Sequence, residues 1–165
     1  MIPVELVAVR VDLASNTPVV LLQEIDDPRR VLPIFIGAPE ATAIAFALQG
    51  VVTPRPMTHD LIREVIENLG ATLEDVLVTE LKEATYFAEL HLAIGTQRST
   101  ISARPSDAIA VAARTGSQIY VSDELMEAEG VELQSEDGDP DSNPEEVVSQ
   151  FKEFLDSVRP EDFQS

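Results

Sequence analysis

The feature that most constrains the fold is an alternation of apolar and polar side chains between residues 85 and 94. Apolar side chains recur there at every second position, at Tyr86, Ala88, Leu90, Leu92 and Ile94. This period is that of a half-buried β-strand. Strand-like stretches also lie on either side, at residues 75–82 and 98–103. We expect the three stretches to form an antiparallel meander.

More strand-like segments occur towards the N-terminus, and one occurs late in the chain. Residues 4–13, 17–25 and 31–36 are rich in Val, Leu and Ile and are separated by the turn-like stretches SNTP and DDPRR. The late segment is QIYV, and one helical turn is expected after it, around residues 124–127. Runs of β-branched and aliphatic residues bounded by turn residues predict strands.

Three segments predict helices. Residues 37–50 have a proline near the start, a glycine at the end and apolar residues on nearly every face, so we expect this helix to be centrally buried. Residues 58–69 place one apolar stripe opposite charged residues, and the stripe consists of Leu61, Ile62, Val65, Ile66 and Leu69. The third helix is expected over residues 105–114, before Gly116. Together these segments predict an α+β fold with a mixed or antiparallel sheet and three main helices.

Composition narrows the class of protein. A chain of 165 residues with 44% hydrophobic content can bury one core. It has no cysteine, which excludes disulfides and thiolate sites. Its longest uncharged run, residues 41–54, is shorter than the ~18 apolar residues that a membrane span needs. The N-terminus also lacks the features of a signal peptide, so we expect a cytoplasmic protein with no membrane association.

The net charge of −19 is concentrated at the C-terminus, where residues 122–165 hold 15 acidic residues against Lys152 and Arg159. Residues 130–144 combine acids, Gly, Pro and Ser with few apolar residues, which is typical of a linker. Beyond them, apolar residues recur at helical spacing, at Val147, Val148, Phe151, Phe154, Leu155 and Val158. We therefore expect a domain over residues 1–130, followed over residues 131–165 by an acidic linker and an amphipathic helix.

Each of the three main helices has an acid in or near its first turn, and these acids are Glu40, Asp60 and Asp107. Arg-Pro precedes two of them, at Arg55 and Arg104. One interpretation is structural, because acids at helix N-termini interact favourably with the helix dipole and proline suits the first turn. Under this interpretation Thr58 and Ser106 are N-cap candidates.

The other interpretation is functional. If the helix starts converge, Glu40, Asp60 and Asp107 could bind Mg²⁺ or Mn²⁺, while Arg55 and Arg104 bind a substrate phosphate. His59, beside Asp60 at the start of its helix, could then activate or position water together with the aspartates. The spacing of these residues leaves both interpretations open.

Four stretches carry a resemblance to a known family, namely LPIFIGAPEATAIAFALQG, RPMTHDLI, ATYFAELHL and SARPSDAIAVAARTGSQIYV. In this order they resemble the bifunctional nuclease domain family over residues 2–130. The resemblance implies a compact α+β fold, an oligomer, with a dimer favoured, and nuclease activity on DNA and RNA. It supplies no established catalytic set, so the candidate residues rest on their chemistry.

Two functional hypotheses follow. The first is a divalent-metal-dependent nuclease of low sequence specificity, with His59, Asp60 and Asp107 as catalytic residues. The second is a non-catalytic oligomeric binding or scaffold module whose acidic tail engages a protein partner. Helix capping would account for every candidate acid in the second hypothesis, and the negative charge is unfavourable for binding a polyanion.

Overall fold

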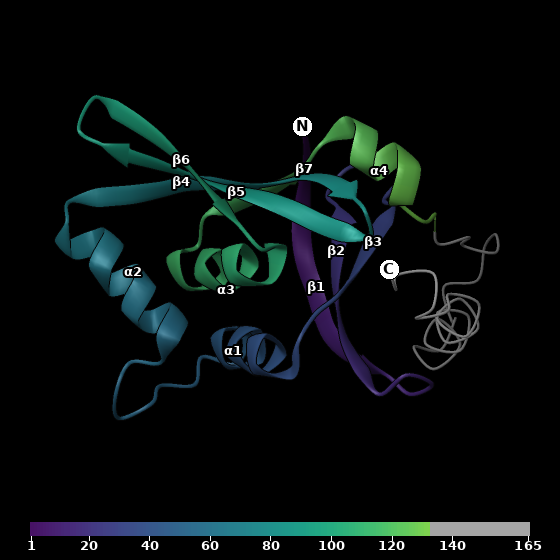
Figure 1. The fold of residues 1–165 in the computed structure, drawn as a ribbon, viewed down its shortest axis with the longest axis horizontal. Helices are drawn as coiled ribbons and strands as arrows, with labels where there is room; N and C mark the ends of the chain where they lie inside the picture. The colour runs from purple at the N-terminus through teal and green to yellow at the C-terminus, as the bar shows by residue number, and fades with distance from the viewer. Residues whose placement is uncertain (133–165) are drawn as a thin grey trace.

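The structure is a computed structural model that describes residues 1–132. Its seven strands form one sheet in the order β3-β2-β1-β7-β4-β5-β6 (Figure 1). All neighbouring strands are antiparallel except β4 and β7, which are parallel. The strands are β1 (Ile2–Asp12), β2 (Thr17–Glu24), β3 (Val31–Phe35), β4 (Ala71–Lys82), β5 (Thr85–Ile94), β6 (Gln97–Ala103) and β7 (Gln118–Val121). The expected antiparallel meander is therefore β4, β5 and β6.

Helices α1 (Ala38–Leu48), α2 (Thr58–Asn68) and α3 (Pro105–Thr115) lie on one side of the sheet, and α4 (Asp123–Glu129) lies at the end of β7 (Figure 1). The α+β class with a mixed sheet and three main helices is confirmed. The helical turn expected after QIYV is longer than predicted and forms α4. No helix within residues 1–132 is long and apolar enough to span a membrane.

The central helix is α3, and the central burial expected for α1 is wrong. Alanines recur at every second position of α3, and they and the apolar residues between them are buried, namely Ala108, Ile109, Ala110, Val111 and Ala112. These small side chains let α1, α2 and the sheet all approach α3 closely. In α1 only Ala41, Ala43 and Ile44 are buried, because α3 and β2 cover only one of its faces.

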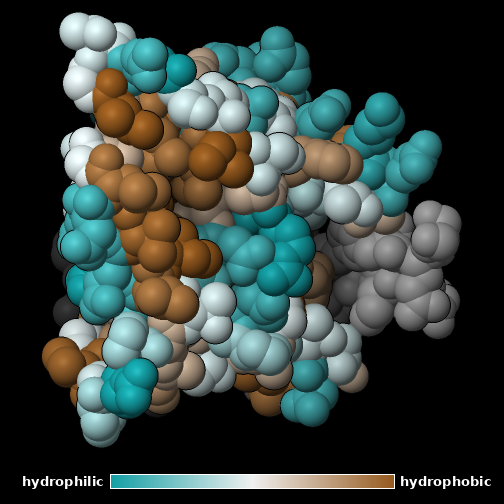
Figure 2. Space-filling model, turned by 60° about the vertical axis from the view of Figure 1, so that its left-hand side comes forward, coloured by the Kyte–Doolittle hydropathy of each residue, from teal (hydrophilic) through white to brown (hydrophobic). Residues whose placement is uncertain are grey.

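The apolar stripe expected on α2 is divided between core and solvent. Ile66 is buried and Ile62 packs against the core, whereas Leu61 and Val65 are 52% and 48% exposed. Leu69 is also exposed. Figure 2 shows a broad apolar band on the side of the molecule where α2 lies. The apolar face of α2 is therefore wider than α3 and the sheet can cover.

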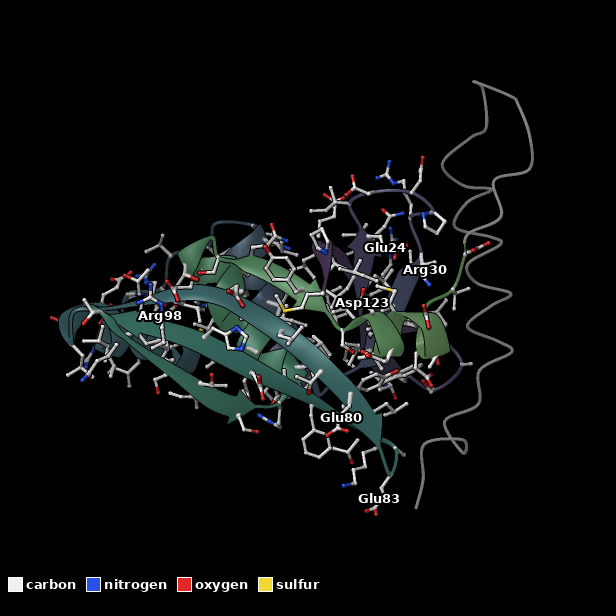
Figure 3. The ribbon with its side chains drawn as sticks, turned by 90° about the horizontal axis from the view of Figure 1, so that it is seen from above. Glu24, Arg30, Glu80, Glu83, Arg98 and Asp123 are labelled. Atoms are coloured by element: carbon white, nitrogen blue, oxygen red, sulfur yellow. The ribbon has the colours of Figure 1, made fainter. Side chains whose placement is uncertain are left out.

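Val131, the first residue of the expected linker, pairs with the first residue of β3. The backbones of Val31 and Val131 are joined by N–H···O bonds of 2.8 and 2.9 Å, which form an isolated bridge beside β3. A partly buried ion pair between Glu24 and Arg30, 2.6 Å long, stabilises the same region. Figure 3 shows these two side chains together at one end of the sheet, far from Arg98 at the other. The expected amphipathic helix lies outside the described residues.

Candidate functional site

The N-terminal ends of α1 and α3 meet, and the side chain of Arg104 joins them. Arg104 immediately precedes Pro105, the first residue of α3, and its Nη2 donates to Glu40 Oε1 of α1 at 2.8 Å. Its Nε donates to Asp107 Oδ2 at 2.7 Å, and Nη2 also donates to Asp107 Oδ1 at 3.1 Å. The guanidinium group is thus held by two carboxylates that lie 67 residues apart in the sequence.

His59 adds a third helix to this cluster. It occupies the first turn of α2, is only 7% exposed, and its Nε2 lies 3.0 Å from Asp107 Oδ1. An ionised carboxylate only accepts hydrogen bonds, so Nε2 carries the hydrogen and donates it to Asp107. The neutral ring then has its lone pair on Nδ1, for which residues 1–132 provide no hydrogen-bond partner. This tautomer leaves His59 able to accept a proton at Nδ1.

The surroundings of Asp107 keep it ionised at neutral pH. Burial by itself would raise the pKa of Asp107, but hydrogen bonds from Arg104 and His59 outweigh burial and lower that pKa below its usual value. In turn, hydrogen bonds to Asp107 and then Glu40 raise the pKa of Arg104. The cluster therefore holds a fixed cation between two acids, with an imidazole against one of them.

Asp60 does not join this cluster in the described part of the chain. Its Oδ1 accepts from Arg114 Nε at 2.5 Å, and its Oδ2 accepts from the backbone N–H of Met57 at 3.0 Å. Arg114 also donates to the carbonyls of Ala110 and Ala43, at 2.8 and 3.0 Å. The hydrogen bond from Arg114 is the main cause that lowers the pKa of Asp60. Asp60 thus ties the start of α2 to α1 and α3.

Arg114 is the residue that the sequence interpretation missed. Its side chain is 5% exposed at the last turn of α3, and three helices share its hydrogen bonds. A basic residue in the last turn of a helix is common for electrostatic reasons, so its sequence position gave no distinctive signal. Arg55, in contrast, is exposed in the α1–α2 loop, and within residues 1–132 its side chain forms no hydrogen bond or ion pair.

The two N-cap assignments made from the sequence are wrong. Met57 and Arg104 occupy the N-cap positions of α2 and α3, which moves Thr58 and Ser106 into the first turns. Proline explains the shift in α3, because Pro105 is suited to the first helical position and leaves Arg104 as the cap. Ser106 is 7% exposed and, rather than capping its own helix, lines a hollow that Gly37 also lines.

Two hollows flank the helix starts. The smaller one, of about 250 Å³, is lined at its polar side by Arg104 and Ser106. The larger one, of about 460 Å³, borders Asp60, Arg63 and Arg114 and does not include the His59 cluster. Asp60 and Arg114 already satisfy one another. Of the cluster formed by Glu40, His59, Arg104 and Asp107, only Arg104 lines the smaller hollow.

The donor set does not fit one metal ion shared by Glu40, Asp60 and Asp107. Arginine nitrogens occupy carboxylate oxygens of all three residues, and Asp60 is held in a separate ion pair. Within residues 1–132 no group of three His, Asp or Glu side chains is arranged to hold a metal. Rotation of both arginines would be needed before the three carboxylates could share a cation.

Comparison with known proteins identifies relatives of the whole chain and of its central part. The family description "Bifunctional nuclease domain" matches residues 20–134, which confirms the resemblance found in the sequence motifs. An uncharacterized protein of Mycobacterium tuberculosis is 44% identical over 164 residues, or 98% of both chains. Bifunctional nuclease 1 of Oryza sativa subsp. japonica is 31% identical over 125 residues, which cover 74% of this chain and 38% of the rice protein. Bifunctional nuclease 1 of Arabidopsis thaliana is 30% identical over 125 residues.

Proposed function

Because the chain belongs to the bifunctional nuclease domain family, we propose that it is a nuclease that hydrolyses phosphodiester bonds in DNA and RNA. The observation that carries the proposal is the convergence of His59, Arg104 and Asp107, with Glu40, from three separate helix starts. A cation for the phosphate and a proton acceptor beside it are the minimum that phosphodiester hydrolysis requires of side chains.

Arg104 is the phosphate-binding group in this proposal. Its side chain is 66% exposed, and its hydrogen bonds to Glu40 and Asp107 come from Nε and Nη2. The two N–H groups of Nη1 have no partner within residues 1–132, so they are free to donate to phosphate oxygens. The carboxylates fix the guanidinium group, which reduces the ordering cost of binding.

His59 and Asp107 handle the proton. Asp107 accepts from Nε2 and thereby orients the ring, while Nδ1 takes the proton from the attacking water. The positive charge that develops on the ring is stabilised by the adjacent carboxylate. Asp107 is thus a positioning residue for His59 as well as for Arg104. This assignment gives Glu40 the lesser role of holding Arg104.

Low sequence specificity is part of the proposal, since contacts to phosphate carry no base information. Activity that depends on Mg²⁺ or Mn²⁺ remains a prediction, and no step above uses a metal. In such enzymes a divalent ion supplies charge stabilisation and a nucleophilic water. Because the three carboxylates are paired with arginines, any ion would have to be held by fewer of them or after rearrangement of Arg104.

Cleavage of labelled single-stranded DNA and RNA by purified protein tests the proposal, with Mg²⁺, Mn²⁺ or EDTA present. We expect Asp107→Asn to reduce the rate by about 10²-fold or more, because both His59 and Arg104 lose an anionic partner. Asp60→Asn is the matched control, and we expect it to retain cleavage per folded molecule. Equal cleavage by wild type and Asp107→Asn, purified identically, would indicate a contaminant and reject this site.

A second candidate function is a non-catalytic oligomeric module. The observation that favours it is the apolar surface of α2, where Leu61, Val65 and Leu69 are exposed. We propose that a second copy of the chain covers this surface, and that the acidic tail engages a protein partner. Light scattering on wild type and on Val65→Asp distinguishes monomer from dimer. A dimer without cleavage would favour the module over the nuclease.

A further inference from the structure

The smaller hollow joins three parts of the chain that are distant in sequence. It lies where β3 leads into α1, where β4 turns into β5, and where β6 leads into α3. Its walls combine aromatic rings with polar groups, and include Phe35, Gly37, Thr85, Tyr86, Arg104 and Ser106. Its volume of about 250 Å³ is sufficient for only part of a larger ligand.

The polar side of the hollow contains donors without acceptors. Ser106 is only 7% exposed, and within residues 1–132 its hydroxyl has no hydrogen-bond partner. Its backbone N–H lies in the first turn of α3, where a helix provides no acceptor. Arg104 lines the same hollow and keeps Nη1 unpaired in that part of the chain. Arg63 Nε is the only side-chain nitrogen or oxygen within residues 1–132 that is both fully buried and without a hydrogen-bond partner, so the Ser106 oxygen is still accessible. Accessible donors on Ser106 and Arg104 make this wall suited to an anionic or acceptor-rich ligand.

The opposite side is apolar and aromatic. Tyr86 stands on the inner face of β5 and packs against the core, with one part of its ring at the hollow. Burial, followed by the charge of Glu129, raises the pKa of Tyr86, so the ring stays neutral beside a phosphate. A neutral aromatic face is a surface on which a nucleobase stacks.

We propose that this hollow is a subsite for one unpaired nucleotide, with the base against Tyr86 and the phosphate on Ser106 and Arg104. The proposal rests on the proposed nuclease function and adds a preference for single-stranded substrate. A base inside a duplex is stacked on both faces and paired, so it cannot enter a hollow of this size without being extruded. An unpaired base can enter directly.

The charge of the chain supports stacking as the source of affinity. The net charge of −19 leaves little attraction for the regular phosphate array of a duplex. Stacking of a base on an aromatic ring contributes affinity that does not come from charge. We therefore expect the chain to bind a single strand, whose bases are free to stack on the protein, more tightly than a duplex.

The test is fluorescence anisotropy of the full chain with a labelled DNA strand of mixed sequence and with the same strand in a duplex, both in EDTA. We expect the single strand to bind at least tenfold more tightly than the duplex. Tyr86→Leu, which keeps apolar bulk, is expected to weaken single-strand binding about tenfold, whereas Tyr86→Phe keeps the ring and binds as the wild type does. Ser106→Ala should weaken binding by a smaller factor.

Phe87→Leu is the matched control, because Phe87 is the next residue of β5, points to the opposite face and does not line the hollow. Equal affinity for strand and duplex, equal weakening by Phe87→Leu and Tyr86→Leu, or no binding of the single strand would each overturn the subsite. Because binding is measured without cleavage, tight Tyr86-dependent binding by a protein that never cleaves would retain the subsite and reject the nuclease. Cleavage that is unchanged by Tyr86→Leu would retain the nuclease and reject the subsite.

Discussion

Two arginines bind acids at helix starts in this molecule, and their surroundings differ sharply. The side chain of Arg114 is 5% exposed and that of Arg104 is 66% exposed. Arg114 bonds Asp60 and two backbone carbonyls, so each of its three side-chain nitrogens donates to an atom of the three helices. Arg104 bonds only carboxylates, Glu40 and Asp107, and keeps one nitrogen for solvent or ligand.

This difference teaches that an Arg-Pro-acid sequence does not determine the role of the acid. Asp60 and Asp107 both lie in the first turn of a helix, and both have lowered pKa values. Asp60 is bound by Arg114, which comes from the end of α3 and is enclosed by helices. Asp107 is bound by Arg104, which lies three residues before it in the sequence and is exposed at the surface. Whether such an aspartate has a structural or a chemical role therefore depends on how deeply the tertiary structure buries its arginine partner.

The largest expected effect is on stability, from Arg114→Met. This change leaves the carboxylate of Asp60 without its partner and releases the carbonyl groups of Ala43 and Ala110. We expect the free energy of unfolding to fall by about 3 kcal/mol or more. Arg104→Met, the matched change at the exposed pair, should lower it by no more than about 1 kcal/mol. Urea unfolding at neutral pH measures both, and equal losses would contradict the comparison.

A smaller effect on stability is expected when acid titrates Asp60. A lowered pKa in the folded state means that Asp60 stabilises the protein above its ordinary value of 3.8 and loses this contribution as pH falls through the folded value. We expect the free energy of unfolding of wild type to exceed that of Asp60→Asn by on the order of 1 to 2 kcal/mol at pH 7. This difference should disappear below about pH 4.

Salt distinguishes the two clusters in the same unfolding experiment. Exposed charges are screened by ions, whereas a buried partner is screened much less. We expect added salt to reduce the difference in the free energy of unfolding between wild type and Asp107→Asn. The corresponding difference between wild type and Asp60→Asn should stay nearly unchanged. A gap that narrows equally for both variants would show that Arg114 is as accessible to solvent as Arg104.

Arg104→Lys tests the chemical role of the exposed pair. A lysine ammonium is a point charge and cannot hold Glu40, Asp107 and a phosphate at the same time in a planar fork. We expect cleavage to fall about tenfold, which corresponds to about 1.4 kcal/mol, with the free energy of unfolding unchanged. Arg114→Lys, the control, should reduce stability and leave cleavage per folded molecule intact. Unchanged cleavage by Arg104→Lys would remove Arg104 from the site.

Much of the fold was predictable because its signals are local. Alternation defined β5, and proline and glycine located the ends of α1 and α3. Burial was not predictable to the same degree, since α1 and α3 are both rich in apolar residues and only packing decides which is central. The stripe on α2 likewise gave no sign that Leu61 and Val65 would remain exposed.

The candidate site was predictable in its members but not in their pairing. Glu40, His59, Arg104 and Asp107 were all recognised from helix-start chemistry, and the structure brings them together. The pairing of Asp60 with Arg114 joins residues 54 positions apart, and no local property of either residue specifies it. Sequence reasoning proposes groups that can react, whereas the tertiary structure determines which of them are already neutralised.

The smallest expected effect concerns Gly37, which precedes α1 and adjoins Glu40. Its φ of −74° is ordinary for any residue, so alanine there costs no backbone strain and restricts the unfolded chain. The added Cβ would, however, collide with Glu40 Oε2, the mobile end of a flexible side chain, and displace that carboxylate from Arg104. We expect Gly37→Ala to stabilise the protein by about 0.5 kcal/mol while cleavage falls roughly two- to threefold. Unfolding and cleavage are compared with those of Glu40→Gln, which loosens the same contact without touching the backbone. If both variants lower cleavage equally, Glu40 acts by holding Arg104. If only Glu40→Gln lowers cleavage, the carboxylate of Glu40 itself takes part in the chemistry.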